Sequence, residues 1–346
     1  MDALSQVLNA VRLTGAVFFN GEFTAPWGFE ASRVETLCSL LPAGTGRLLI
    51  YHLVIEGQAV LRTAGGAQTR LGSGDVVVLP HGDRHTFSNG APLRYLDGST
   101  TLLETFGTTD LNLIRHGGGG AATRFICGYF GCERQADRLF LAGLPALIKL
   151  NVRDDPGGEW LENSIRHLVR EGCTDRPGNR ALLSKMAEAL LIEVLRRYME
   201  GLPPGHTGWL AAARDPVVGT ALALLHRDPS HPWTVAELAS KVGASRSVIG
   251  QRFPQLLGAT PLAYLARWRL LLASRLLETT PRTIVQVANE VGYESEAAFS
   301  RAFKREFGLS PARYRRLHEG GDSEASPEGR LIPRGERPQY RASEPG

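Results

Sequence analysis

The spacing of apolar positions divides the chain into a first part with the period of strands and a second part with the period of helices. Residues 3–12 carry apolar side chains at helical spacing; after them the period shortens to two, with frequent glycines between the runs. These runs predict strands at 17–19, 48–55, 59–62, 76–79, 93–96 and 125–130. Many short strands at this spacing indicate a sandwich or a barrel.

After residue 138 the apolar positions recur at helical spacing. Residues 160–170 and 180–199 predict two amphipathic helices, whose apolar stripes must be buried against the strands, against each other or against a second subunit. Residues 201–208 contain two prolines and three glycines and predict a hinge. Asp215 and Pro216 then predict the start of another helix.

The stretch 233–316 contains the same short pattern twice. The first copy has Leu238-Ala239, Val242-Gly243, Phe253, Gly258, Pro261 and Tyr264, and the second has Val287-Ala288, Val291-Gly292, Phe303, Gly308, Pro311 and Tyr314. The earlier landmarks are 49 residues apart and the later ones 50, so one extra residue lies in the turn of the second copy. A repeated unit of this length indicates a supersecondary motif used twice.

Each copy has the pattern of a helix–turn–helix. In the first copy, Thr234 and Glu237 predict a capping box, Gly243 predicts the end of the first helix, and Ser245 predicts the cap of the second. Thr283, Gly292 and Ser295 take these positions in the second copy. Between the copies, Pro261 begins a longer helix that we expect to hold the two motifs at a fixed separation.

The second helix of such a motif lies in the major groove of DNA, so its outward side chains are the expected base contacts. They are Arg246, Ser247, Gly250 and Gln251 in the first copy and Glu296, Ala297, Ser300 and Arg301 in the second, whereas Lys304, toward the end of that helix, is an expected phosphate contact. Residues 231–319 contain 13 Lys and Arg against 7 Asp and Glu, an excess of 6, whereas the whole chain carries +4. This local excess favours a phosphate-binding surface. The alternative is a small helical bundle with a solvated basic face.

The second copy resembles the AraC/XylS family of bacterial transcription regulators. The residues that carry the resemblance are Ile284, Ala288, Val291-Gly292-Tyr293, Phe299 to Lys304, Phe307-Gly308, Ser310-Pro311 and Tyr314-Arg315. The resemblance implies a sequence-specific DNA-binding regulator that contacts RNA polymerase, and helices at 139–200 that form a homodimer. Internal packing of these helices remains the alternative. Pro254 departs from the family pattern and predicts that the first recognition helix ends or kinks there.

The first part resembles the cupins, which are small double-sheet barrels that enclose a ligand. Gly74, Pro80, Gly82, His85 and Asn89 have the spacing of the second cupin motif, and residues 52–57 resemble the first. A cupin ahead of an AraC-type region implies a sensor for a small-molecule effector. The expected pocket residues are Trp27, Phe29, His52, His81 and His85. Each of them is otherwise an ordinary core residue.

The family's metal ligands are replaced in this chain. Ile50 occupies the position of the cupin Glu, Gly44 and Gly46 occupy those of two His, and His85 alone remains. We therefore expect no metal, no cofactor and no enzymatic activity. A cupin oxygenase or isomerase fused to a DNA-binding module is the main alternative, and an architectural DNA protein is another.

The four cysteines form no closely spaced pair of the kind that binds metal. They are Cys38, Cys127, Cys132 and Cys173, and we expect them to be reduced structural thiols. A redox role for Cys127 and Cys132 is the alternative.

These patterns predict an α+β multidomain protein that regulates transcription, by family habit as an activator. The expected parts are a cupin-like β-barrel at 1–138, a helical dimerisation segment at 139–200, a linker at 201–214, an all-α double helix–turn–helix domain at 215–318 and a disordered tail at 319–346. Since there is no long apolar run and no signal-peptide pattern, we expect a cytoplasmic protein. Promoter DNA, RNA polymerase and a small-molecule effector are the expected partners. The identities of the effector and operator, and the choice between activation and repression, stay open.

Overall fold

The computed structural model describes residues 2–10, 13–31, 45–90, 94–98, 113–133, 140, 143–154, 156–171 and 177–319. Cys38, Cys173 and all but the first residue of the predicted tail lie outside these ranges, and so does the side chain of Cys132. Within the described ranges, no helix is long and apolar enough to cross a membrane.

Two β-sheets form the N-terminal half of the molecule. The first contains, in order, β11 (Ile148–Asn151), β6 (Asp75–Leu79), β3 (Thr45–Glu56), β10 (Ala122–Glu133), β1 (Leu13–Thr24) and β9 (Leu113–Gly117). The second contains β5 (Gln68–Gly72), β4 (Gln58–Thr63), β7 (His85–Asn89), β2 (Trp27–Glu30) and β8 (Leu96–Asp97). The predicted strands are confirmed except for 93–96, where Arg94 and Tyr95 lie outside any strand and β8 begins at Leu96. The described strands form two facing sheets and no closed barrel. The helical pattern expected after residue 138 is wrong for β11, which pairs with β6.

Alternate side chains of the six-stranded sheet are buried on opposite faces. On β3, Leu49, Tyr51 and Leu53 belong to one hydrophobic cluster, whereas Leu48, Ile50 and Val54 belong to the cluster between the two sheets. This is the period of two expected of a strand that is covered on both sides. Both faces of this sheet are therefore core, and its outer face needs a cover.

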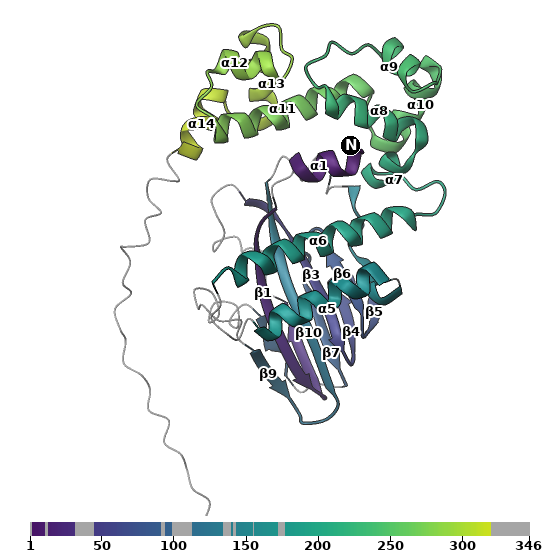
Figure 1. The fold of residues 1–346 in the computed structure, drawn as a ribbon, viewed down its shortest axis with the longest axis vertical. Coiled ribbons are helices and arrows are strands. Elements are labelled where there is room, and N and C mark those ends of the chain that lie inside the picture. Colours follow the sequence, from purple (N-terminus) through teal and green to yellow (C-terminus); the bar gives the residue numbers. More distant parts are fainter. Residues whose placement is uncertain are drawn as a thin grey trace, which may run out of the picture.

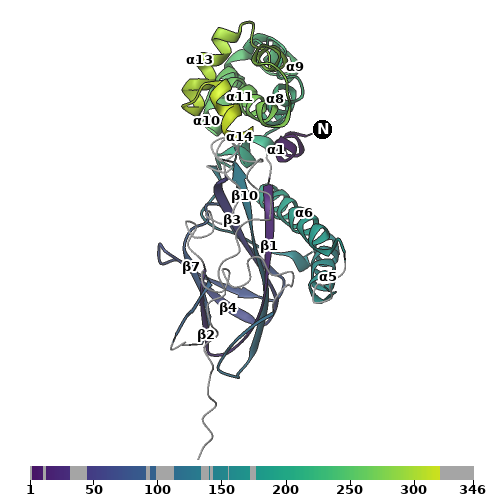
Figure 2. The ribbon, with the colours of Figure 1, turned by 90° about the vertical axis from the view of Figure 1, so that its left-hand side faces the viewer.

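Helices α5 (Pro156–Glu171) and α6 (Asn179–Glu200) lie along that outer face (Figures 1 and 2). Both were predicted from their apolar stripes. The buried part of the α6 stripe consists of Leu190, Leu191, Val194 and Leu195. Other large apolar side chains of this pair point to solvent: Trp160 is 66% exposed, Leu182 49% and Ile192 43%.

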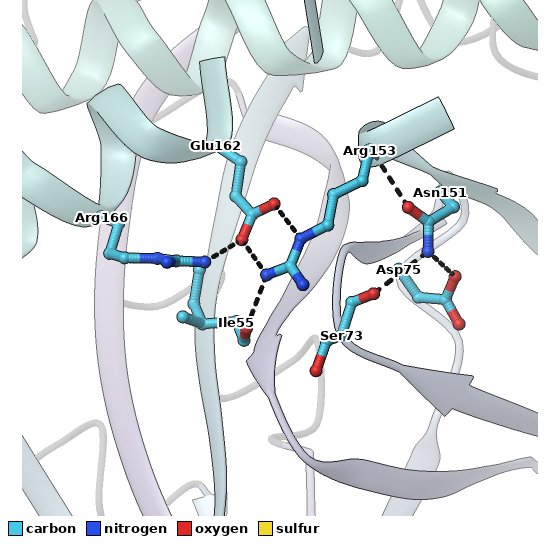
Figure 3. A network of polar contacts seen from close by, with 7 residues as sticks. All are labelled: Ile55, Ser73, Asp75, Asn151, Arg153, Glu162 and Arg166. Carbon is cyan, nitrogen blue, oxygen red and sulfur yellow. Dashed lines mark hydrogen bonds and ion pairs between the residues drawn. The ribbon is translucent and has the colours of Figure 1, made fainter. Parts of the chain in front are cut away.

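A buried carboxylate fastens α5 to one end of the sheets (Figure 3). Glu162 is 1% exposed and accepts from Arg153 through Nε at 2.6 Å and Nη2 at 2.5 Å. Arg166 donates to the same carboxylate, and Arg153 also donates to the carbonyl oxygen of Ile55 at 2.9 Å. The network continues through Asn151, Asp75 and Ser73. Because its members come from α5, from the 3-10 helix before it (Val152–Asp154), from strands β3, β6 and β11 and from the turn at Ser73, it ties α5 to the sheet.

The C-terminal half is helical, and the repeat predicted from the sequence is confirmed. After α8 (Pro216–Arg227), the motifs consist of α9 (Val235–Lys241) with α10 (Arg246–Leu257) and of α12 (Ile284–Glu290) with α13 (Glu296–Phe307). They are joined by α11 (Pro261–Thr279) and followed by α14 (Pro311–Glu319). The first helices of both motifs have 7 residues and the second helices have 12. Figure 1 shows one motif at each end of α11.

Two short helices connect the halves of the molecule. Helix α7 (Trp209–Arg214) lies within the predicted linker, and its Trp209 is buried against Phe140 and Tyr264. The N-terminal helix α1 (Ala3–Ala10) packs on α7 and α8 (Figure 1). One hydrophobic cluster runs from the outer face of the six-stranded sheet through these helices into α8–α11. The two halves therefore share buried apolar surface.

Candidate functional site

Side-chain caps set the start of each helix in both motifs, as predicted. Thr234 accepts from the Glu237 N–H and Ser245 from the Val248 N–H. In the second motif, Thr283 forms a complete capping box with Gln286, and Ser295 accepts from the Ala298 N–H. The capping box expected in the first motif is wrong, because the Glu237 carboxylate contacts His231 Nε2 at 2.9 Å instead.

Glycines end the first helices in the left-handed conformation. Gly243 has φ +67° and Gly292 has φ +84°, which confirms the predicted stops. The cap that follows in each motif then directs the second helix away from the first, as in a helix–turn–helix.

The second helices, α10 and α13, present one buried and one exposed side. Ile249 and Phe253 are fully buried in α10, and Phe299 and Phe303 are fully buried in α13. The predicted contact residues Arg246, Ser247, Gly250, Gln251, Glu296, Ala297, Arg301 and Lys304 are exposed, and Ser300 is half-buried. The structure therefore leaves the predicted residues of each helix open to a partner.

Two further exposed residues were missed by the sequence reasoning. Gln255 follows Gln251 by four residues and Arg305 follows Arg301 by four, so each lies one turn further along the same face. The 50-residue offset that relates the other positions also relates this pair and could have found them.

The neighbouring Arg252 makes a contact within the protein, although 44% of its side chain is exposed. Its guanidinium forms an ion pair with Asp215 at 2.7 Å, and Asp215 caps the start of α8. This pair holds the recognition helix α10 against α8.

Pro254 does not end the first recognition helix. Helix α10 continues through it to Leu257, and Gly258 then ends the helix with φ +66°. The predicted helix end at Pro254 is therefore wrong, and the alternative of a kink there stays a prediction. Proline lacks the N–H that would bond the Gly250 carbonyl four residues earlier, and because Gly250 is exposed, water can reach that carbonyl.

In the N-terminal half, the structure brings two of the predicted pocket histidines together between the sheets. His52 Nε2 lies 2.8 Å from His85 Nε2, and His52 Nδ1 lies 2.5 Å from the Cys127 Sγ. His85 Nδ1 lies 2.7 Å from the carbonyl oxygen of Asp83. A carbonyl only accepts, so His85 donates from Nδ1 and must accept at Nε2. His52 therefore donates from Nε2 and accepts the Cys127 S–H at Nδ1.

This chain of hydrogen bonds is complete with both imidazoles neutral. Burial lowers the pKa of His85 to about 4 and, together with the neighbouring His85, lowers the pKa of His52. Burial also raises the pKa of the Cys127 thiol, which opposes the reactive thiolate that a redox role needs. Cys127 was missed as the partner of His52 because the two residues are 75 positions apart.

The other predicted pocket residues lie apart from this chain. Trp27 and Phe29 belong to the aromatic cluster around Phe125 between the sheets, and Trp27 is fully buried. No described residue accepts a hydrogen bond from Trp27 Nε1. His81 is half-buried in the turn after β6, where its Nε2 contacts the carbonyl oxygen of Leu144 at 2.9 Å. In the described part of the chain, no three His, Cys, Asp or Glu side chains are grouped so that they could hold a metal ion.

Comparisons with known proteins agree with both halves. A cupin family model matches residues 2–200, and a helix-turn-helix domain model matches residues 238–317. The HTH-type transcriptional regulator AlkR of Acinetobacter baylyi is 32% identical over 91% of this chain and 99% of its own length. A putative AraC-like transcription regulator of Streptomyces lividans is 35% identical over 78% of this chain and 87% of its own.

A third relative covers most of the chain, whereas one solved structure covers about a third of it. The RCS-specific HTH-type transcriptional activator RclR of Escherichia coli is 29% identical over 91% of this chain and 97% of its own. The DNA-binding domain of AdpA in complex with a target DNA is 33% identical, covers 33% of this chain and 99% of that chain, and has a TM-score of 0.30.

Proposed function

Because this chain belongs to the AraC family of transcription regulators that carry an N-terminal cupin domain, we propose that it activates transcription from specific promoters in response to a small molecule. The observation that carries the proposal is the matched pair α10 and α13. Each helix buries two large apolar side chains and leaves a polar face open. Two such helices in one domain are suited to two successive stretches of the major groove.

The exposed residues fall into two chemical groups, those suited to contact bases and those suited to contact phosphates. Arg246 and Arg301 carry the planar guanidinium that pairs with the edge of guanine, and Gln251 carries the amide that pairs with adenine. Lys304 and Arg305 lie toward the end of α13 and are suited to phosphates, which fix the register but carry no base information.

We further propose that the protein acts as a homodimer joined through α5 and α6. The exposed side chains Trp160, Leu182 and Ile192 support this, because large apolar groups on a helical surface favour contact with another surface. A dimer would bring two double motifs to one promoter and raise the affinity through avidity.

We propose that the small molecule binds in the cupin domain, between the two sheets near Trp27. Trp27 supports this site because its N–H is buried among aromatic rings and no described residue accepts from it. The relative RclR is named a transcriptional activator, which supports activation here and hence contact with RNA polymerase.

The experiment that tests the proposal uses the full chain in two stages. Duplexes with a randomised centre are first selected by repeated binding to the protein. A selected site is then placed upstream of a weak promoter, and transcription by purified RNA polymerase is measured with and without a library of small molecules. We expect one sequence to be enriched and one class of compound to raise transcription. Enrichment without any effect on transcription would contradict activation, and no enrichment would contradict specific DNA binding.

A further inference from the structure

The two helix–turn–helix motifs have separate cores that meet at the connecting helix. Tyr264, Leu265 and Trp268 of α11 belong to the core of the first motif, whereas Leu270, Ala273 and Leu277 belong to the core of the second. If α11 were the whole connection, the direction of α10 relative to α13 would depend on the bending and twisting of one helix. A second contact beside α11 removes that freedom.

Arg269 makes such a contact from the middle of α11. Its Nε donates to the carbonyl oxygen of Pro229 at 2.6 Å, and its Nη2 donates to that of His231 at 2.9 Å. The carbonyl oxygen of Ser230 lies 3.5 Å from the same Nη2. Three successive carbonyls of the loop between α8 and α9 therefore converge on one half-buried guanidinium. These bonds attach the entry of the first motif to α11.

The turn of the second motif closes on the same loop. Gly292 ends α12, and a Cβ added to it would lie 2.7 Å from Ser230 Cα, 2.8 Å from the Ser230 oxygen and 2.9 Å from Arg269 Nη2. Such distances are too short for any side chain. The turn of the second motif thus touches both the loop of the first motif and the arginine that holds the loop.

The repeat provides an internal comparison for this contact. Gly243 occupies the position of Gly292 in the first motif and also has a positive φ, +67°. A Cβ added to Gly243 would meet nothing within 4 Å. The backbone conformation explains a glycine in both turns, but only Gly292 also serves a close approach. This difference between the two glycines indicates that the motifs contact each other at Arg269, Ser230 and Gly292.

We propose that Arg269 is a positioning residue that fixes the spacing of the two half-sites this protein recognises in DNA. The inference rests on the proposed DNA binding through α10 and α13. Moving one half-site by one base pair rotates it by about 34° around the DNA axis, since one turn contains about 10.5 base pairs. A domain with two points of attachment between its motifs cannot follow that rotation. A domain held by α11 alone follows it in part.

The test measures the affinity of the full chain for its selected bipartite site and for versions with one base pair added to or removed from the spacer. For the wild type we expect the altered spacers to weaken binding by about tenfold or more. Arg269→Ala should weaken binding to the original spacing and reduce the penalty for altered spacing to about threefold or less. Arg269→Lys keeps the charge but loses the planar fork and should give an intermediate penalty.

Two matched variants separate positioning from folding and from charge. Gly292→Ala and Gly243→Ala carry the same left-handed backbone strain, but only Gly292→Ala should reduce the spacing penalty. Arg267→Ala removes an exposed charge from the same helix and should keep the wild-type penalty. If Arg269→Lys and Gly292→Ala fold and both keep the full penalty for altered spacing, the inference about Arg269 is overturned, while the proposed DNA binding stands. If the wild type enriches no sequence, the proposed DNA binding fails and the inference fails with it.

Discussion

At the scale of the residue, the buried histidines of both halves are neutral because burial lowers their pKa. His226 lies in the core of the first motif, stacked on Trp268. Trp209 Nε1, which can only donate, contacts the Tyr264 oxygen at 2.9 Å. The Tyr264 hydroxyl keeps its own proton, which it can donate to His226 Nε2 at 2.8 Å. Burial lowers the pKa of His226 to about 3, against a smaller opposing effect of the Ala3 backbone.

This depressed pKa predicts a loss of stability in acid. The unfolded chain binds a proton at His226 below about pH 6.5, whereas the folded chain does so only near pH 3. The free energy of unfolding therefore falls as the pH falls between these values, and His226 contributes about 1.4 kcal/mol per pH unit to the slope. In His226→Gln the amide oxygen can accept the Tyr264 bond without titrating. We expect the slope to be smaller by that amount.

The measurement is urea unfolding at several pH values, followed by tryptophan fluorescence, to which Trp209, Trp233 and Trp268 contribute from this half. His206→Gln, at an exposed histidine, is the control and should leave the slope unchanged. An unchanged slope in His226→Gln would show that the folded chain carries the proton.

A second prediction at this scale distinguishes residues that contact bases from residues that contact phosphates. Arg301 projects from the exposed side of α13, opposite Phe299 and Phe303. An arginine that pairs with guanine contributes about 1–3 kcal/mol of discrimination. We expect Arg301→Ala to lose more affinity for the selected site than for scrambled DNA. Lys304→Ala should weaken both alike and lower the salt slope by roughly one.

Binding titrations on both duplexes at several salt concentrations check this prediction. The same profile for Arg301→Ala and Lys304→Ala would contradict the placement of α13 in the groove.

At the scale of the element, the position of α5 depends on the carboxylate of Glu162. Glu162→Gln removes the charge that balances Arg153 and Arg166 but keeps the shape of the side chain. Breaking a buried ion pair from one side costs about 3–5 kcal/mol, and we expect about 2–3 kcal/mol here because both arginines stay partly exposed. Glu188→Gln breaks the surface pair with Lys185 and should cost less than about 1 kcal/mol. Urea unfolding of both variants checks this, and equal losses would show that the network is not a fastening point.

The elements that the sequence predicts well are those whose signals are local. Thr283, Gly292 and Ser295 lie within a few residues of the helix ends they define, so α12 and α13 follow from the sequence. The strand β11 carries no such signal, because it is a strand by virtue of its pairing with β6, about 70 residues earlier. The same holds for the site. The outward faces of α10 and α13 follow from helical spacing, whereas the partners of His52 and Arg269 depend on the fold.

At the scale of the whole molecule, the N-terminal helix α1 joins the two halves. Val7 is fully buried in the cluster that α1 shares with α7 and α8. Arg275 of α11 donates to the carbonyl oxygens of Asn9 at 2.9 Å and Ala10 at 2.8 Å, both in the last turn of α1. The helix that precedes the first strand thus belongs, by its contacts, to the DNA-binding half.

The contacts of α7 determine where an isolated DNA-binding fragment should begin. A fragment that begins at Ala211 would cut α7 and lose Trp209, so the useful fragment is 205–319. We expect it to fold and bind DNA, but with lower affinity than the full chain and with an α8 that opens more readily, because α1 no longer covers it.

In the full chain, Val7→Asp and Arg275→Ala should have the same effect on α8. Arg267→Ala, at an exposed arginine of α11, should not.

Hydrogen exchange resolved to peptides of α8 measures this opening directly, since amide protection follows the free energy of local unfolding. Burying an unpaired carboxylate at Val7 should lower that free energy by about 2 kcal/mol or more, which corresponds to about thirtyfold faster exchange of the α8 amides. The strands lie outside these contacts of α1, so the hydrogen-exchange rates of their amides should stay unchanged. If α8 exchanges at the wild-type rate both in Val7→Asp and in fragment 205–319, α1 is a passive neighbour of the DNA-binding half. If α8 opens in both to the same degree, α1 supplies the stability of α8 that the fragment lacks.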